Sequence, residues 1–289
     1  MATKLPLFSA TVLLLFIAFH VVLAAKPSPG CGKTIDFASG NRTTTVNQKQ
    51  RLYVVKVPEN YNNTHPYRLI FTFHGYGDSG AIVANGQKSY LPWFGLPPLA
   101  NGDDVGAIFV SPTGLNTVWA NSGGEDIAFV DDMIRTVEAN LCVDQNLRFS
   151  TGFSFGGAMS YAIACARAKQ FRAVAVISGG PLSGCAGGTD PIAYYAQHGV
   201  GDAQVSISAG RQLRDTFVRN NNCTVPQSPV VEPRSGDGTL VKTEFSGCAQ
   251  GYPVVWVAFD GGHTPTPVLK GANTTFSVLE SWAFFKQFR

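Results

Sequence analysis

A serine between two glycines offers the clearest chemistry in this chain. Within Leu147–Met159, the motif Gly152-Phe153-Ser154-Phe155-Gly156 follows an apolar run that predicts a strand and precedes small residues that predict a helix. G-x-S-x-G at such a junction is typical of a nucleophile elbow, a sharp turn that exposes the serine hydroxyl above a sheet. The glycines carry no Cβ, so they fit the tight turn. We therefore predict that Ser154 is a nucleophile, with an ordinary glycine-rich turn as the alternative.

A serine hydroxyl becomes a nucleophile only when a base accepts its proton and an acid orients that base. We expect His263 to be the base, because it follows the last apolar strand and precedes the terminal helix. Asp202, in the turn after the strand that ends near His198, is the expected acid. The chain order Ser154, Asp202, His263 is that of α/β hydrolases and differs from the orders in chymotrypsin and subtilisin.

Each assignment has a structural alternative. His263 could be an ordinary loop histidine, and Asp202 could cap the helix that follows it, which is a common use of aspartate. Asp260 is a rival acid, although its place beside His263 favours a strand-end role. His74 and His198 are the other candidate bases, and we expect His74 to be a hydrogen-bonded structural residue.

The tetrahedral intermediate of acyl transfer carries a negative oxygen, which needs two donors aimed at it. The backbone N–H of Phe155 is one expected donor. The glycine-rich segment Phe71–Asp78 should supply the other, and we choose the N–H of Tyr76. Trp119 lies in a loop that leads from a strand end into a helix, so we expect it to border the serine and to stack on a substrate ring. Burial in the core is the alternative for Trp119.

The first 25 residues have the pattern of a secretory signal peptide. Lys4 precedes an apolar run from Ala10 to Phe19 that continues from Val21 to Leu23, and Ala24-Ala25 supply the small residues of a cleavage site. A transmembrane anchor is the alternative. We expect residues 26–289 to form one domain that is secreted from the cell.

Six cysteines lie in residues 26–289, and none is arranged as C-x-x-C with histidines at zinc spacing. We therefore expect three disulfides, no metal and no other cofactor. Helices that descend to the same edge of the sheet should bring Cys142 near Cys165. We expect a Cys223–Cys248 bond, which would tie together the two ends of a long segment. Elimination then leaves Cys31–Cys185.

Glycosylation sequons and the charge balance indicate the compartment and the partner. The chain has glycosylation sequons at Asn41, Asn62, Asn222 and Asn273. They agree with passage of the protein through an oxidising, glycosylating compartment. The net charge is only +3, without a basic block or an acidic tail. We therefore expect a neutral partner, and neither a nucleic acid nor a membrane surface.

Strand-like and helix-like runs alternate along the chain. The predicted strands are Arg51–Pro58, Tyr67–His74, Val105–Ser111, Leu147–Phe153, Phe171–Ser178, Pro191–His198, Thr239–Phe245 and Tyr252–Phe259. The predicted helices are Glu125–Cys142, Phe155–Ala168, Val205–Asn220 and Thr275–Phe288, and long loops are predicted at Asn85–Asp104, Gly179–Asp190 and Asn221–Gly238. This alternation predicts an α/β fold with a mostly parallel central sheet, helices on both faces and an antiparallel edge.

These motifs together resemble those of secreted fungal feruloyl esterases of carbohydrate esterase family 1, which have the α/β-hydrolase fold. The matching segments are Gly30–Lys33, His74-Gly75, Glu125–Asp132, Gly152–Gly157, His198–Asp202 and Gly261–His263. The resemblance implies hydrolysis of the ester between ferulic acid and the arabinose side chains of plant xylan, through a feruloyl-enzyme intermediate and without a metal. Its implied partner is a feruloylated cell-wall polysaccharide.

Other functions on the same scaffold remain open at this point. Acetyl xylan esterases and polyhydroxyalkanoate depolymerases look similar at the serine and histidine, and the depth of the acyl pocket should separate them from feruloyl esterases. The loop aromatics Trp93, Phe94 and Trp119 favour the longer feruloyl group. A non-catalytic carbohydrate-binding relative and a peptidase are further alternatives.

Overall fold

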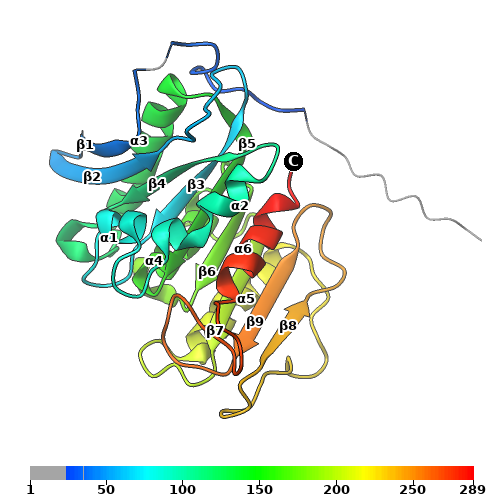
Figure 1. The fold of residues 1–289 in the computed structure, drawn as a ribbon. Coiled ribbons are helices and arrows are strands. Elements are labelled where there is room, and N and C mark those ends of the chain that lie inside the picture. Colours follow the sequence, from blue (N-terminus) through cyan, green and yellow to red (C-terminus); the bar gives the residue numbers. More distant parts are fainter. Residues whose placement is uncertain (1–23, 35) are drawn as a thin grey trace, which may run out of the picture.

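One mixed sheet forms the centre of the computed structural model, which describes residues 24–34 and 36–289 (Figure 1). Its strands are β1 (Gly40–Val46), β2 (Lys49–Lys56), β3 (Tyr67–Phe73), β4 (Ala107–Pro112), β5 (Val143–Phe153), β6 (Ala173–Ile177), β7 (Ala193–Gly199), β8 (Leu240–Glu244) and β9 (Val254–Phe259). The helices are α1 (Gly80–Asn85), α2 (Pro97–Asn101), α3 (Glu125–Asn140), α4 (Phe155–Ala166), α5 (Ile207–Asn220) and α6 (Ser277–Lys286).

The strands follow the order β1-β2-β4-β3-β5-β6-β7-β9-β8 across the sheet. From β4 to β9 in this order, neighbouring strands are parallel. The pairs β1-β2, β2-β4 and β8-β9 are antiparallel. The predicted α/β-hydrolase fold with an antiparallel edge is therefore confirmed, and β8 adds a second antiparallel edge.

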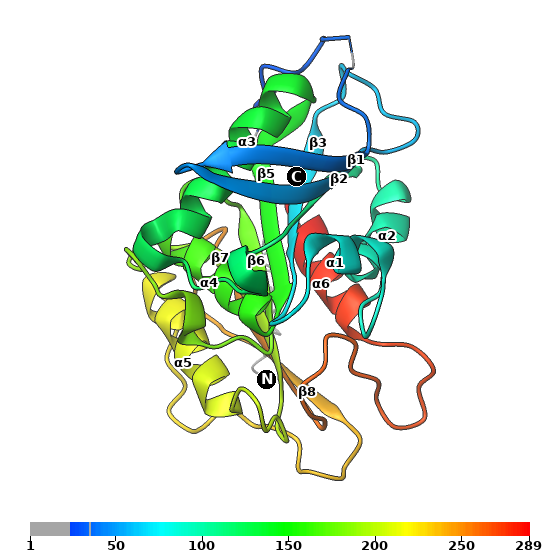
Figure 2. The ribbon, with the colours of Figure 1, turned by 90° about the vertical axis from the view of Figure 1, so that its left-hand side faces the viewer.

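Alternation along the strands sends side chains into two separate cores. In β3, Leu69, Phe71 and Phe73 pack in the core that includes residues of α3, α4 and α5, whereas Ile70 packs in the core of α1, α2 and α6. Every residue of β3 is buried, as expected for a parallel strand with both faces covered. Figure 2 shows the two groups of helices on opposite sides of the sheet.

The predicted strands and helices are all present, with bounds that differ by a few residues. The strand β1 was not predicted. None of its side chains is buried, so its sequence is polar and lacks the alternating apolar residues that indicate a strand. The helices α1 and α2 were also missed, and α2 lies inside the predicted loop Asn85–Asp104. These helices have only six and five residues, which is too short for a helical period to be recognised.

All six cysteines form disulfides, but two of the three predicted pairings are wrong. The bonds are Cys31–Cys142, Cys165–Cys185 and Cys223–Cys248, and only the last was predicted. The chain near Ser28 runs beside the start of β5, and the N–H of Ser28 donates to the carbonyl of Val143. This path brings Cys31 to Cys142. The segment between β6 and β7 returns to the end of α4, where the N–H of Gly188 donates to the carbonyl of Cys165, and this brings Cys185 to that residue. Helix ends at a common edge therefore did not identify the partners, since Cys142 pairs with Cys31 in a turn and Cys165 pairs with Cys185 in a loop.

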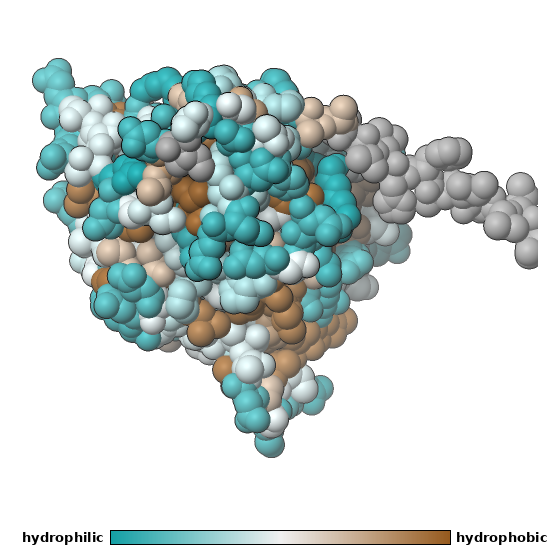
Figure 3. All heavy atoms as spheres, turned by 45° about the horizontal axis from the view of Figure 1, so that its top comes forward, coloured by the Kyte–Doolittle hydropathy of each residue, from teal (hydrophilic) through white to brown (hydrophobic). Residues whose placement is uncertain are grey.

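The predicted signal peptide lies almost wholly in residues 1–23, outside the described residues. Of the helices within residues 24–34 and 36–289, none is long and apolar enough to span a bilayer. On the face seen in Figure 3, hydrophilic and intermediate residues prevail, and hydrophobic ones occupy smaller areas. This surface agrees with the gathering of apolar side chains into the two cores.

Candidate active site

Ser154 forms the turn between β5 and α4. Its backbone has φ 57° and ψ −117°, a conformation that residues other than glycine rarely adopt. A Cβ on Gly152 would lie 2.3 Å from the carbonyl oxygen of Gly156, and a Cβ on Gly156 would lie 2.1 Å from that of Phe73. Only glycine fits at these two positions. The glycines of the G-x-S-x-G motif are therefore needed because the turn has no room for a Cβ, as the sequence predicted.

His263 bridges Ser154 and Asp202. Its Nε2 lies 2.8 Å from Oγ of Ser154, and its Nδ1 lies 2.7 Å from Oδ2 of Asp202. A carboxylate can only accept, so Nδ1 carries the proton and Nε2 presents its lone pair to the serine hydroxyl. The structure thus brings the three predicted residues into one hydrogen-bonded chain, although 109 and 61 residues separate His263 from its two partners.

The carboxylate of Asp202 is buried and fully hydrogen-bonded. Its Oδ1 accepts from the backbone N–H groups of Gln204 and Val205, at 2.9 and 2.8 Å. Burial alone would raise the pKa of Asp202, but hydrogen bonds from His198, His263 and these amides lower the pKa far below its ordinary value. Asp202 is therefore a stable anion that accepts the Nδ1 hydrogen of His263. It does not cap α5, whose N-cap is Ser206.

Two glycine-rich turns fix Asp202, the predicted acid, relative to His263, the predicted base. The N–H of Gly201 donates to the carbonyl of Gly261 at 2.9 Å, and a Cβ on Gly199 would lie 2.4 Å from that same oxygen. The backbones after β7 and β9 therefore touch directly, which places Asp202 beside His263. The rival acid Asp260 instead accepts from the N–H groups of Gly236 and Gly238 and ties down a neighbouring loop.

The two predicted oxyanion donors lie on segments that meet at the elbow. A Cβ on Gly75 would lie 3.6 Å from the carbonyl oxygen of Phe153, so the loop after β3 passes close to the serine turn. Among the described residues, the N–H groups of Tyr76 and Phe155 donate to no backbone or side-chain acceptor. Free amides at a nucleophile are what an oxyanion hole requires.

Tyr90 holds this loop, and the sequence interpretation missed it. Its hydroxyl accepts from the N–H of Gly75 at 2.8 Å and donates to Asp78 at 3.1 Å, and Lys88 pairs with the same carboxylate. Burial raises the pKa of Tyr90 well above its ordinary value, so the hydroxyl keeps its proton. No sequence signal marked this tyrosine, because its partners lie across a loop without periodicity.

His74 is a structural histidine, as expected. Its Nδ1 donates to the carbonyl of Gly75 at 2.6 Å, and its Nε2 accepts from the N–H of Gly114 at 3.0 Å. Burial is the main cause that lowers the pKa of His74 to about 4, so the ring is neutral at neutral pH.

Trp119 does not border the site with an exposed ring, so that prediction is wrong. The side chain is fully buried, its Nε1 donates to the carbonyl of His74 at 2.9 Å, and its ring packs edge-on against Phe73. Trp93 and Phe94 are also buried, so these three rings give no support for a feruloyl pocket. Trp119 packs in the core of α3, α4 and α5, and Trp93 and Phe94 pack in the core of α1, α2 and α6. Tyr76, in the loop after β3, is instead 75% exposed.

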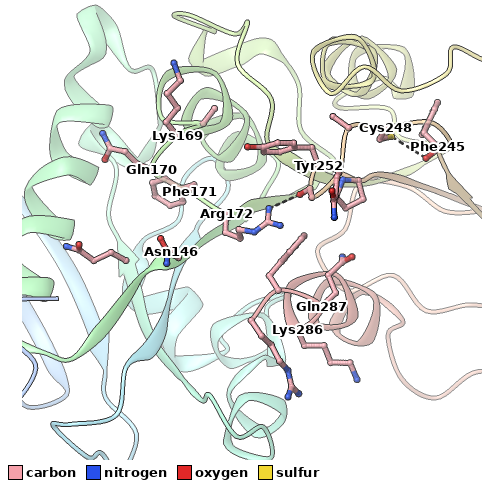
Figure 4. A pocket seen from close by; sticks show the side chains of 18 of the residues that line it. Asn146, Lys169, Gln170, Phe171, Arg172, Phe245, Cys248, Tyr252, Lys286 and Gln287 are labelled. Atoms are coloured by element: carbon pink, nitrogen blue, oxygen red, sulfur yellow. Dashed lines mark hydrogen bonds between the residues drawn. The ribbon is translucent and has the colours of Figure 1, made fainter. Parts of the chain in front are cut away.

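A cavity of about 1210 Å³ lies at the other end of the sheet, where the parallel strands begin. Figure 4 shows Lys169 and Lys286 directed away from one another, while Arg172 donates to the carbonyl of Gly251. Lys169 is also paired with Asp190 at 3.1 Å. The positive charges of Lys169, Arg172 and Lys286 therefore do not converge on one position inside the cavity. Within the described ranges, no group of three His, Cys, Asp or Glu side chains is placed to hold a metal ion.

Curated relatives align with nearly the whole chain. Feruloyl esterase D of Neurospora crassa is 49% identical over 282 residues, which cover 96% of this chain and 96% of the relative. Feruloyl esterase C of Emericella nidulans is 48% identical over 274 residues, which cover 94% of this chain and 96% of the relative. No protein-family model matches the sequence.

Solved structures share the fold at low sequence identity. An acetyl xylan esterase from Aspergillus awamori has a TM-score of 0.60 and 15% identity, and the match covers 86% of this chain and 99% of the other. A CE1 ferulic acid esterase from Anaeromyces mucronatus, solved with ferulic acid, has a TM-score of 0.51 and 17% identity, with 70% and 88% covered. Such distant likeness establishes the fold alone, whereas near-half identity along almost the full length establishes kinship. The chain belongs to the feruloyl esterase family of carboxylic ester hydrolases.

Proposed function

We propose that this protein hydrolyses feruloyl and related hydroxycinnamoyl esters of plant cell-wall arabinoxylan, with Ser154, His263 and Asp202 as its catalytic triad. The observation that carries the proposed mechanism is the pair of contacts made by His263, at 2.8 Å to the serine and 2.7 Å to the aspartate. The substrate class is supported by relatives that are named feruloyl esterases and are 45–49% identical to this chain.

The first half-reaction forms an acyl-enzyme. As Oγ of Ser154 attacks the ester carbonyl carbon, Nε2 of His263 takes the hydroxyl proton. The N–H groups of Tyr76 and Phe155 stabilise the negative oxygen of the intermediate. Nε2 then returns the proton to the departing sugar oxygen, and the bond between that oxygen and the carbonyl carbon breaks.

The second half-reaction releases the acid. Nε2 of His263 takes a proton from water, whose oxygen attacks the acyl carbon, and the proton passes back to Oγ of Ser154 as the acyl bond breaks. The anionic Asp202 stabilises the imidazolium in both halves because it accepts the Nδ1 hydrogen throughout. The balance is one water consumed, with one carboxylic acid and one sugar hydroxyl formed.

Secretion and glycosylation complete the proposal. The side chains of Asn41, Asn62, Asn222 and Asn273 are exposed, so each sequon is accessible to a glycan. Three disulfides agree with an oxidising compartment. Expression in a secreting host, followed by N-terminal sequencing and glycosidase treatment, would test cleavage near Ala25 and occupancy of the sequons.

A panel of esters tests the function. Purified protein should hydrolyse methyl ferulate, methyl sinapate or methyl caffeate and release ferulic acid from feruloylated arabinoxylan, with Ser154→Ala as the blank. Turnover of acetylated xylan in preference to every hydroxycinnamate would favour an acetyl xylan esterase instead. Cleavage of peptides or polyhydroxyalkanoate without cleavage of methyl ferulate would overturn the proposal.

A further inference from the structure

His198 contacts the triad from a side that the proposed mechanism does not use. The residue is next to the last in β7, and its ring is 1% exposed. Its Nε2 lies 2.8 Å from the carbonyl oxygen of Val205 and 3.3 Å from Oδ2 of Asp202. The carboxylate oxygen that accepts from His263 therefore has a second histidine beside it.

The proton on this ring can be assigned from its partner. A backbone carbonyl oxygen only accepts hydrogen bonds, so Nε2 of His198 carries a hydrogen that it donates to Val205. The same N–H dipole lies within 3.3 Å of the Asp202 carboxylate. A donor in that place stabilises the anion in its observed position.

Val205 links the ring to the other carboxylate oxygen as well. The N–H of Val205 donates to Oδ1 of Asp202 at 2.8 Å, while the carbonyl of Val205 accepts from His198. The ring thus holds the turn that holds Oδ1, and it also contacts Oδ2. Because β7 is a central strand paired on both sides, His198 connects this turn to a rigid part of the sheet.

The packing around the ring shows that the fold makes room for it. A Cβ on Gly210, inside α5, would lie only 2.3 Å from Nδ1 of His198. A glycine within a helix costs about 1 kcal/mol relative to alanine, so its presence here needs a compensating reason. The ring of Trp256 lies on another side, with its centroid 6.2 Å away and the two planes 29° apart. The imidazole consequently has little freedom to move.

We propose that His198 is a positioning residue of the triad, which holds the Asp202 carboxylate in register with Nδ1 of His263. The proposal rests on the esterase function proposed above. Removal of the donor lets the carboxylate and its turn shift, and the imidazolium of His263 is then less well stabilised in the transition state. We expect this loss to lower kcat and to leave KM nearly unchanged, since His198 is buried away from the substrate.

Two replacements of His198 separate the hydrogen-bond donor from the space that the ring fills. His198→Phe keeps a flat ring without a donor, and His198→Gln places an amide donor near the position of Nε2. On methyl ferulate, we expect kcat to fall about tenfold or more in His198→Phe and to stay within about threefold of wild type in His198→Gln. Equal kcat values in His198→Phe and wild type would overturn the proposal.

A double-mutant cycle shows whether the effect passes through Asp202. In an Asp202→Asn background the carboxylate is absent, so adding His198→Phe should lower kcat by less than about twofold. An independent structural role predicts the same tenfold loss in both backgrounds, and that result would contradict positioning. His65→Phe is the matched control, because this distant ring also lies at hydrogen-bond distance from a carbonyl, that of Val105 at 3.0 Å. It should leave kcat unchanged.

Gly210→Ala provides the test without altering any hydrogen-bonding group, including the case in which His198→Phe does not fold. The added Cβ would displace the ring, whereas alanine is a better helix former than glycine. A severalfold loss of kcat in a folded Gly210→Ala protein supports positioning, and full activity contradicts it. Ser154→Ala is measured alongside: if it keeps turnover, the proposed function fails, whereas an inactive Ser154→Ala beside a fully active His198→Phe refutes only the role of His198.

Discussion

The two ends of the parallel strands use their polar groups in different ways. Where the strands begin, the fully buried Arg68 donates to Asp103 at 2.5 Å and to the carbonyl of Phe288, and Cys31–Cys142 closes the chain covalently. Where the strands end, the Ser154 hydroxyl faces the lone pair on Nε2 of His263. The backbone N–H groups of Tyr76 and Phe155 have no partner among the described residues. At the first end, both terminal nitrogens of the Arg68 guanidinium are paired within the protein, although its Nε has no partner among the described residues. At the second end, two backbone donors beside Ser154 stay free.

This difference predicts which property each end controls. A group that is fully paired in the folded state contributes to stability when the chain folds. A group left free contributes only when a transition state supplies its partner. Substitutions at the carboxyl ends of the strands should therefore change catalysis, and those at the opposite end should change stability.

Ser154→Ala should show the largest effect at the catalytic end. Without the proposed nucleophile, kcat on methyl ferulate should fall about 10⁵-fold or more, because the other two residues of the proposed triad cannot act alone. The unfolding temperature should be unchanged or slightly higher, since the hydrogen bond found for the Ser154 hydroxyl is the one to His263 in the site. Kinetics combined with thermal denaturation measures both, and substantial residual turnover would contradict the assignment.

Asp103→Ala should show the opposite pattern. It leaves the buried guanidinium of Arg68 without its carboxylate, which should lower the free energy of unfolding by about 3–5 kcal/mol. Its neighbour Asp104 is exposed, and Asp104→Ala should cost less than about 0.5 kcal/mol. Denaturant unfolding measures the difference, and kcat should match wild type in both variants. A loss of kcat in folded Asp103→Ala would break the separation between the two ends.

Loss of the Cys31–Cys142 bond should lower stability by about 2–5 kcal/mol without lowering kcat at low temperature. The bond closes a separation of 111 residues, against 20 for Cys165–Cys185. In the chain-entropy model, the double serine variant at the longer loop should therefore lose about 1–2 kcal/mol more. Equal losses from paired denaturation curves would show that local packing, and not loop length, sets the values.

His74 gives a smaller effect, which depends on pH. Its pKa falls from 6.5 in the unfolded chain to about 4 in the folded protein, chiefly because of burial. Between these values the unfolded state binds the proton and the folded state does not, so the free energy of unfolding decreases as pH falls, by up to about 3 kcal/mol. Above pH 6.5 this contribution is fully present.

Unfolding curves of wild type and His74→Gln from pH 7 to pH 4 should isolate the contribution of this histidine. We expect the wild type to lose more stability than the variant over this interval, because the glutamine does not titrate. Parallel curves would show that folding does not change the pKa of His74 and would contradict the prediction.

The sequence determined the features that depend on neighbouring residues. Gly152 and Gly156 predicted the elbow because each lies two residues from Ser154 in the sequence, although the backbone that excludes a Cβ at Gly156 belongs to Phe73. The order of Ser154, Asp202 and His263 predicted the triad because parallel strands bring their carboxyl ends to one edge. The alternation of strands and helices predicted the mostly parallel sheet, because a helix that connects two strands lets them run in the same direction.

Only the tertiary structure decided which distant segments touch. Cys31 meets Cys142 because the N-terminal segment runs beside β5, and Trp119 is buried because the end of β3 accepts its indole hydrogen. Tyr90 and His198 acquired their contacts in the same way, through loops that no periodicity describes. Such contacts depend on the packing of the whole chain, so composition and spacing alone could not specify them.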